Sequence, residues 1–249
     1  MTFFANIAAK EHCDHNELCS FCLDIDDAGY QPLTNVEVEL YLSRIKLTAP
    51  GCDGIPAWLL KTCSYELADI VTCILNCSFR TGCVPSPWLN ALVTPVSKVP
   101  NPTCMSDFRP ISVTPHLSRI AEKILVRRWL FPSIPTANII DQYAFKPSDS
   151  TTAALIHFTD KLTKMLETNN YVRCLMIDFS KAFDTVDHVQ FAKQIDSVRS
   201  SYLCYKYWIC SFLSGRSQQC KVNGQLSNMA NVGLSIVQGS VLALHFILL

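Results

Sequence analysis

An apolar run that ends in a single carboxylate constrains this chain most. Residues 172–177 are apolar except for Arg173, and Asp178 follows them directly. After Asp178 the apolar side chains recur at helical rather than strand-like spacing. This change predicts a buried strand that carries Asp178 to its open end, where a polar group can face a cleft. A carboxylate in such a position suits Mg²⁺, which binds through one or two carboxylates together with substrate phosphates.

Spacing alone supports a second interpretation of Asp178. Aspartate is a favoured helix N-cap, and a helix-like segment begins directly after this residue. Helix capping and metal binding therefore stay open as alternatives until the rest of the chain is considered.

The charge balance gives no global signal for nucleic acid. The chain has 249 residues, of which 49% are hydrophobic, enough for one large domain or two small ones. Its 21 basic and 21 acidic residues cancel, so a polyanion must meet a local patch. The section from residue 98 to residue 146 is such a patch, because Lys98, Arg109, Arg119, Lys123, Arg127, Arg128 and Lys146 outnumber Asp107, Glu122 and Asp141.

The cysteines and the hydropathy pattern predict an intracellular protein, cytoplasmic or nuclear rather than secreted. The 13 cysteines are scattered, odd in number, and lie in a chain too large to need a disulfide scaffold. The first residues lack the basic leader and long apolar core of a secretory signal. The apolar run Val241–Leu249 is too short to span a bilayer, so no membrane partner is expected.

Residues 1–34 are interpreted as a poorly ordered N-terminal extension. Cys19 and Cys22 have the two-residue spacing of half a zinc site, and His12 and Cys13 precede them. A second Cys/His pair at the usual downstream distance does not follow. Zinc binding and incidental cysteines remain the two alternatives.

The pattern of helices and strands predicts an α+β protein. The expected helices cover residues 34–47, 57–80 with a break near Ser64, 117–130, 151–166, 185–198 and 201–213. The expected strands cover residues 91–99, 172–178, 218–222 and 229–237, and the last two are joined by an Asn223–Gly224 turn. Residues 49–56 and 107–112 are expected to form a loop and a turn.

Five short segments stand out in a fixed order along the chain. They are APGCDGIP at 49–56, FRPIS at 108–112, QYAFKP with STT at 142–152, DFSKAFDTVDH at 178–188 and QGSVL at 238–242. Together they resemble the reverse transcriptase domain of non-LTR (LINE-type) retrotransposons. The resemblance covers about Asn35 to Leu249, nearly everything after the N-terminal extension.

The resemblance implies an α+β right-hand polymerase fold. Residues 35–166 would form a fingers-like region and residues 167–249 part of the palm, with the thumb absent. The implied activity is RNA-directed DNA polymerisation with Mg²⁺, dNTPs and an RNA template that carries a DNA primer.

The resemblance also implies roles for individual residues. Asp178 matches the catalytic palm aspartate that binds metal, and the backbone carbonyl of Phe179 would be a further ligand. The implied nucleotide-binding residues are Arg109, Phe183 as a steric gate against a 2′-hydroxyl, and Gln238; the template and primer would contact Gly239, Ser240, Arg127 and Arg128. Without the resemblance, Arg109 is interpreted as a surface arginine and Phe183 as a core residue.

Two departures from the family pattern weaken the catalytic interpretation. Ser235, Val237, Ala243 and Leu244 occupy places where the family more often has Gly or Pro. No Asp or Glu follows Asp196, so the family's aromatic-x-Asp-Asp motif is not found. We therefore expect a truncated domain with an incomplete Mg²⁺ site that is inactive alone. The alternative is a non-catalytic retrotransposon remnant that binds nucleic acid or protein.

Overall fold

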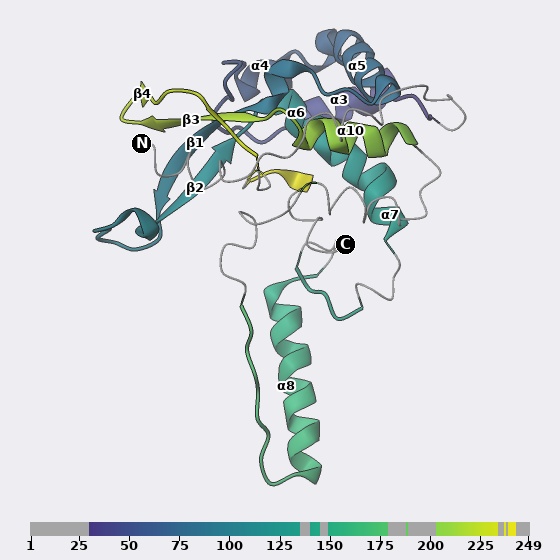
Figure 1. Ribbon diagram of the computed structural model, residues 1–249. Coiled ribbons are helices and arrows are strands. Elements are labelled where there is room, and N and C mark those ends of the chain that lie inside the picture. Colours follow the sequence, from purple (N-terminus) through teal and green to yellow (C-terminus); the bar gives the residue numbers. More distant parts are fainter. Residues whose placement is uncertain are drawn as a thin grey trace.

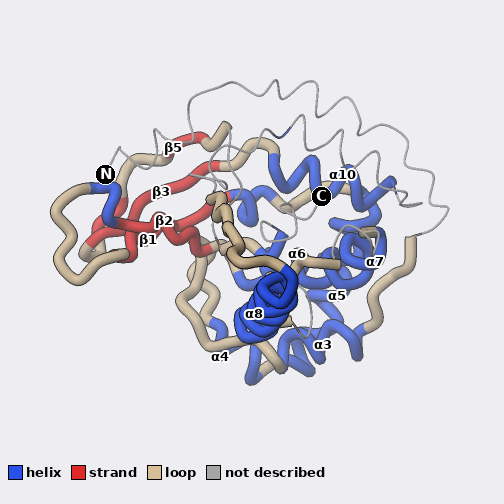
Figure 2. The backbone as a smooth tube through the Cα atoms, turned by 90° about the horizontal axis from the view of Figure 1, so that it is seen from below, coloured by secondary structure: helices blue, strands red, loops and turns tan. Residues whose placement is uncertain are grey.

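A group of helices and a mixed sheet lie side by side in the described part of the chain (Figures 1 and 2). The computed structural model describes residues 30–134, 140–144, 149–178, 188, 203–233, 237 and 239–242. Several predictions lie outside these residues: the zinc ligands His12, Cys13, Cys19 and Cys22, the helix at 185–198 except for His188, and Phe179, Phe183 and Gln238.

The first described helix, α3 (Asn35–Ser43), begins where the sequence predicts. The Oγ1 atom of Thr34 accepts a hydrogen bond from the backbone N–H of Glu37 at 3.3 Å, which satisfies one of the free donors of the first turn. The predicted end at residue 47 is too late, because Arg44 already leaves the helical conformation. The Glu37 carboxylate pairs with Arg128 and so links α3 to a distant helix.

The next helical segment is broken as expected. Helix α4 (Ala57–Thr62) and helix α5 (Ser64–Thr81) are separated at Cys63, and α5 ends at Gly82. Gly82 has a φ of 64°, the left-handed conformation that glycine adopts at little cost after a helix.

The sheet has the order β2-β1-β3-β4, and β5 pairs with β3. Strand β1 (Asn90–Ser97) follows a short 3₁₀ turn (Ser86–Leu89) and pairs antiparallel with β2 (Phe108–Val113). It pairs parallel with β3 (Ser217–Val222), but only over Asn90–Val93. Pro95 therefore lies beyond this parallel pairing, and its missing N–H removes no hydrogen bond to β3.

The prediction of a turn at residues 107–112 is wrong for most of its length. Only the short 3₁₀ turn Met105–Asp107 precedes the strand, and residues 108–113 form β2. Each β2 residue is paired with a β1 residue, from Phe108 opposite Ser97 to Val113 opposite Leu92. The proline in this segment suggested a turn, whereas β1 provides pairing partners 11 to 21 residues earlier in the chain.

The core lies where α5, α6 and α10 meet. Helix α6 (His116–Leu125) continues through a π-helical turn (Val126–Leu130) into the short α7 (Phe131–Ser133), close to the predicted span. Helix α10 (Leu203–Leu213) brings Tyr205 and Trp208 to this core. The rings of Trp129 and Tyr205 stack at 3.5 Å, and Trp208 donates a hydrogen bond to the Oγ atom of Ser78 at 2.8 Å.

The predicted Asn223–Gly224 turn is confirmed. Both residues have positive φ values, 51° and 80°, as the tight turn of a two-residue hairpin requires. The returning strand is β4 (Gln225–Leu226), so the predicted strand at 229–237 is wrong as the partner across this turn. Within the described residues of that range only β5 (Ala230–Asn231) is a strand, and it pairs with the beginning of β3.

Helix α8 (Thr151–Thr168) projects away from the other elements (Figure 1). The Oγ atom of Ser150 accepts a hydrogen bond from Ala153 N at 3.2 Å, so the predicted start is confirmed. No residue of α8 is buried, although Leu155, Ile156 and Phe158 are apolar. No helix in the described ranges is long and apolar enough to cross a membrane.

The prediction of a buried strand ending at Asp178 is wrong. Residues 171–178 form no strand, and Leu175, Met176 and Ile177 are 85%, 78% and 75% exposed. A buried strand needs a hydrogen-bonded neighbour, and none of the described strands pairs with this segment. The coarse prediction of a mixed helix and sheet protein is confirmed.

Candidate functional site

Three of the five sequence motifs lie around α6 and the residues that precede it. The first contact joins the loop at 49–56 to the residues before the helix. A Cβ atom at Gly51 would lie 2.5 Å from the backbone N of Pro115 and 2.8 Å from the carbonyl carbon of Thr114. Only glycine permits this approach of two backbones, so the loop packs directly against the turn that begins α6.

Arg119 of α6 holds the same loop. Its guanidinium donates hydrogen bonds to the Oγ1 atom of Thr48 at 3.1 Å and to the carbonyl of Ala49 at 3.2 Å. Burial lowers the pKa of the neighbouring His116, and the positive charge of Arg119 lowers it further. This histidine is therefore neutral at pH 7.

The motif at 238–242 approaches β2 through Gly239. This residue has a φ of 109°, and a Cβ atom there would lie 3.0 Å from the carbonyl oxygen of Ser112. Ser112 is the last residue of the FRPIS motif, so two motifs separated by more than 120 residues are neighbours. Arg109 is exposed on the same strand, roughly 10 Å away along β2 at about 3.3 Å per residue.

Ser240 binds a buried glutamate in α6. The Oε2 atom of Glu122 accepts a hydrogen bond from the Ser240 hydroxyl at 2.5 Å. It also accepts bonds from the backbone N–H groups of Val241 at 2.8 Å and Leu242 at 3.3 Å. Glu122 is fully buried. Burial raises the pKa of Glu122, against the opposing effects of these hydrogen bonds and of the positive charge of Arg216.

Arg216 is the second buried charge of this site. Its Nη1 atom donates to the carbonyl of Phe212 at 2.8 Å, and its guanidinium lies 4.4 Å from the centre of the Phe212 ring. Burial lowers the pKa of Arg216 to about 10, and the carboxylate of Glu122 opposes that shift. Among the described residues, the Nη2 atom of Arg216 and the Oε1 atom of Glu122 have no hydrogen-bond partner.

The basic residues of α6 and its continuation differ in their exposure to solvent and in their contacts with other residues. Arg127 is exposed and lies 5.9 Å from the centre of the Tyr41 ring. Arg128 is held by its ion pair with Glu37 and by a hydrogen bond to the carbonyl of Gln31 at 3.3 Å. Burial lowers the pKa of Lys123, and the positive charges of Arg119, Arg127 and Lys46 lower it further, so these four side chains form a basic cluster.

A comparison with known protein families shows to which family the chain with these motifs belongs. Residues 98–247, more than half of the chain, match the family described as reverse transcriptase (RNA-dependent DNA polymerase). The chain belongs to the reverse transcriptase family. The resemblance to the domain of LINE-type elements is thereby confirmed.

Two relatives place the chain among proteins of mobile elements. It is 26% identical over 255 residues to the RNA-directed DNA polymerase from mobile element jockey of Drosophila melanogaster. The aligned region covers 96% of the chain and 27% of that protein. It is 24% identical over 184 residues to the retrovirus-related Pol polyprotein from type-1 retrotransposable element R2 of Popillia japonica, covering 70% of the chain and 24% of that protein. The chain thus spans about a quarter of the length of the curated relatives it matches.

The described residues of this reverse transcriptase domain do not by themselves fit a metal centre. Asp178 is exposed and makes no hydrogen bond or ion pair with another described residue. The described ranges hold no group of three or more His, Cys, Asp or Glu side chains that could bind a metal ion. The second predicted ligand, the carbonyl of Phe179, lies outside those ranges.

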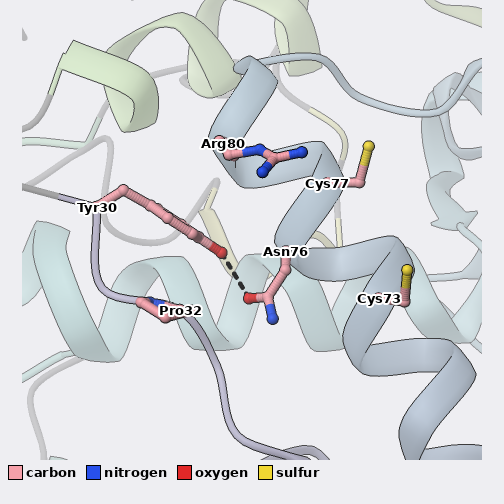
Figure 3. Close-up of a pocket in the computed structure, with 6 residues that line it drawn as sticks. All are labelled: Tyr30, Pro32, Cys73, Asn76, Cys77 and Arg80. Atoms are coloured by element: carbon pink, nitrogen blue, oxygen red, sulfur yellow. Dashed lines mark hydrogen bonds between the residues drawn. The ribbon is translucent and has the colours of Figure 1, made fainter. Parts of the chain in front are cut away.

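A separate hollow of about 570 Å³ lies on the outer face of α5 (Figure 3). Tyr30 crosses it, and its hydroxyl donates to the Oδ1 atom of Asn76 at 2.5 Å. The lining residues are Tyr30, Pro32, Cys73, Asn76, Cys77 and Arg80, and none of them belongs to the five motifs. The hollow is therefore distinct from the meeting point of the motifs at α6.

Sequence reasoning missed Glu122 and Arg216. In the sequence, Glu122 is only one of three acidic residues in the basic section 98–146, and Arg216 lies in none of the five motifs. The one available signal was position: Glu122 follows Ile120 and Ala121 and lies three residues before Leu125, in an apolar stretch where an unpaired carboxylate is unfavourable. Its partner Ser240 lies 118 residues away, a distance at which no local pattern can connect the two.

Proposed function

We propose that this chain is the fingers and part of the palm of an RNA-directed DNA polymerase of a non-LTR retrotransposon. In this proposal residues 35–166 form the fingers-like region and residues 167–249 belong to the palm. The observation that supports it is the convergence of the motifs at 49–56, 108–112 and 238–242 on α6 and the residues that precede it.

The chain's own residues would act mainly by binding and positioning. Arg109 is exposed on β2, and a guanidinium can hold two phosphate oxygens of an incoming dNTP at once. Gly239 offers backbone without a side chain beside β2, where template and nucleotide can approach closely. Phe183 would exclude a ribose 2′-hydroxyl by its bulk, and Gln238 would contact the nucleotide.

Asp178 and the carbonyl of Phe179 are proposed as ligands of Mg²⁺. In nucleotide transfer such ions activate the primer 3′-hydroxyl and neutralise the departing pyrophosphate, and a single carboxylate does not hold two of them. The 249 residues contain no Asp or Glu after Asp196. The isolated chain is therefore expected not to extend primers.

Primer extension on an RNA template tests this expectation. The purified chain, a DNA primer, dNTPs and Mg²⁺ should give no incorporation above background. Incorporation that Asp178→Ala abolishes would overturn the expected inactivity, and it would at the same time establish the polymerase assignment directly.

The basic cluster of Lys46, Arg119, Lys123 and Arg127 favours a second candidate, a non-catalytic module that binds nucleic acid. The two candidates differ in their response to nucleotide. A polymerase domain should bind a primed RNA template more tightly when the next complementary dNTP is present, and Arg109→Ala should remove this gain. A general nucleic-acid module should bind equally with and without the dNTP.

A further inference from the structure

We propose that Glu122 is a positioning residue that fixes the Gly239–Ser240 loop of this reverse transcriptase domain to α6, within a buried site shared with Arg216. The inference rests on the proposed function, because that function makes the loop a contact for template and nucleotide. The attachment itself is a structural claim that can be tested without any activity.

The hydrogen bonds of Glu122 are concentrated on one short segment. A single carboxylate oxygen accepts from the Ser240 hydroxyl and from the N–H groups of Val241 and Leu242. A carboxyl oxygen has two lone pairs and can accept several hydrogen bonds at once. Three donors on consecutive residues fix both the place and the direction in which the chain leaves the loop.

Burial explains why this arrangement is more than a packing contact. A carboxylate with no exposed surface is unfavourable for folding unless charges and donors compensate it. An apolar side chain of similar volume would fill the same position in α6 with no such penalty. The carboxylate therefore contributes what an apolar side chain cannot, which is a directed attachment of residues 240–242.

Arg216 connects the same site to the sheet. It lies directly before β3, and its backbone carbonyl accepts a hydrogen bond from Val232 N at 2.9 Å. Its buried charge favours the ionised form of Glu122, and Glu122 in turn favours the charged form of Arg216. Arg216 thus opposes the effect of burial on the pKa of Glu122, which is still raised overall, and the Oε2 atom remains the acceptor for residues 240–242.

The loop is also fixed from its other side. Gly239 approaches the carbonyl of Ser112 on β2, the strand that carries Arg109. A loop held by β2 on one side and by Glu122 on the other keeps a set position relative to Arg109. Release of the Glu122 attachment would let the loop move while Arg109 stays in the sheet.

Hydrogen exchange of the intact chain tests the attachment. In Glu122→Ala the amides of Val241 and Leu242 should exchange at least about tenfold faster than in the wild type, because they lose their buried hydrogen-bond acceptor. Glu122→Gln keeps an acceptor oxygen and should show a smaller increase. Glu167→Ala, an exposed change on the projecting helix α8, is the matched control and should leave both amides unchanged.

Ser240→Ala covers the case in which Glu122→Ala does not fold. It removes one donor and leaves the carboxylate in place, so exchange at Val241 should rise about threefold to tenfold. Unchanged exchange at Val241 and Leu242 in a folded Glu122→Ala or Ser240→Ala variant would overturn the attachment.

The affinity of Glu122 variants for a primed RNA template distinguishes a positioning role of Glu122 from a role in stabilising the fold alone. Glu122→Ala should weaken binding about tenfold in protein that is still folded, and Glu122→Gln should restore part of it. Faster exchange with unchanged template affinity would overturn the positioning role. Faster exchange in a chain whose wild type binds no template would contradict the proposed function and leave the attachment intact.

Discussion

Two regions of the molecule have similar apolar content but differ in burial. One is the meeting point of the motifs at α6, and the other is the projecting segment from α8 to Asp178. At α6 the motifs are held by backbone contacts at Gly51 and Gly239 and by the buried carboxylate of Glu122. The projecting segment has no buried residue in α8 and exposes Leu175 to Ile177. The difference teaches that apolar sequence forms a site only where a distant part of the chain covers it.

The largest expected effect lies in the core that supports the α6 region. Trp208→Ala removes a fully buried ring and its hydrogen bond to Ser78, and should lower the free energy of unfolding by about 4 kcal/mol. Phe158→Ala on α8 should change it by less than about 0.5 kcal/mol. Urea unfolding measures both. Equal losses would break the contrast between the two regions.

A smaller loss is expected from crowding at the loop of residues 49–56. Gly51→Ala places a Cβ atom against the backbone of Pro115 and should cost about 3 kcal/mol. Gly54→Ala is the matched control, because Gly54 has open space around it and only a positive φ, so it should cost about 1 kcal/mol. Chemical denaturation of the two variants compares them directly. A Gly51→Ala loss no larger than that of Gly54→Ala would mean that the loop does not pack against Pro115.

Local signals predicted the elements that local chemistry decides. The start of α3, the end of α5 and the Asn223–Gly224 turn each depend on a few neighbouring residues, and each was predicted to within one residue. Strand β2 was missed because its own residues do not reveal its pairing with β1, 11 to 21 residues earlier. The strand at 172–178 was predicted wrongly because apolar content does not specify a pairing partner.

The same limit applies to the candidate site. The motifs at 49–56, 108–112 and 238–242 were visible in the sequence, whereas their convergence depends on contacts such as Gly239 to Ser112. Glu122 became visible only through its bond to Ser240, 118 residues away. Residue identity thus predicted the candidate chemistry, and tertiary packing decided which candidates meet.

The ionisation of Glu122 predicts a pH dependence of stability in the α6 region. Its pKa in the folded state is raised above the ordinary value of 4.5, so folding favours the protonated form. This contribution to stability is fully present below pH 4.5 and is lost as the pH rises through the folded pKa. The loss amounts to about 1.4 kcal/mol for each unit of elevation.

The free energy of unfolding as a function of pH checks this prediction. The wild type minus Glu122→Gln difference should fall as the pH rises above 4.5, with Arg216 charged throughout. A difference that rises with pH would show that the hydrogen bonds and Arg216 outweigh burial, and that the folded pKa is depressed.

The smallest effect is expected in the projecting segment. Leu175→Ser should change the free energy of unfolding by less than about 0.5 kcal/mol, because Leu175 is already exposed to water. A buried strand would instead lose about 2–5 kcal/mol on such a change. Thermal or urea unfolding of this variant therefore decides between the exposed segment and the strand expected from the sequence.

Binding of a primed RNA template at several salt concentrations tests the central claim most directly. The account predicts binding at low salt that weakens as salt rises, with Arg127→Glu lowering the slope of log affinity against log salt by about 1. Arg80→Glu, an exposed reversal on α5 outside the basic cluster, should leave that slope unchanged. Absence of binding at low salt, or equal effects of the two reversals, would contradict a reverse transcriptase domain that meets nucleic acid at α6.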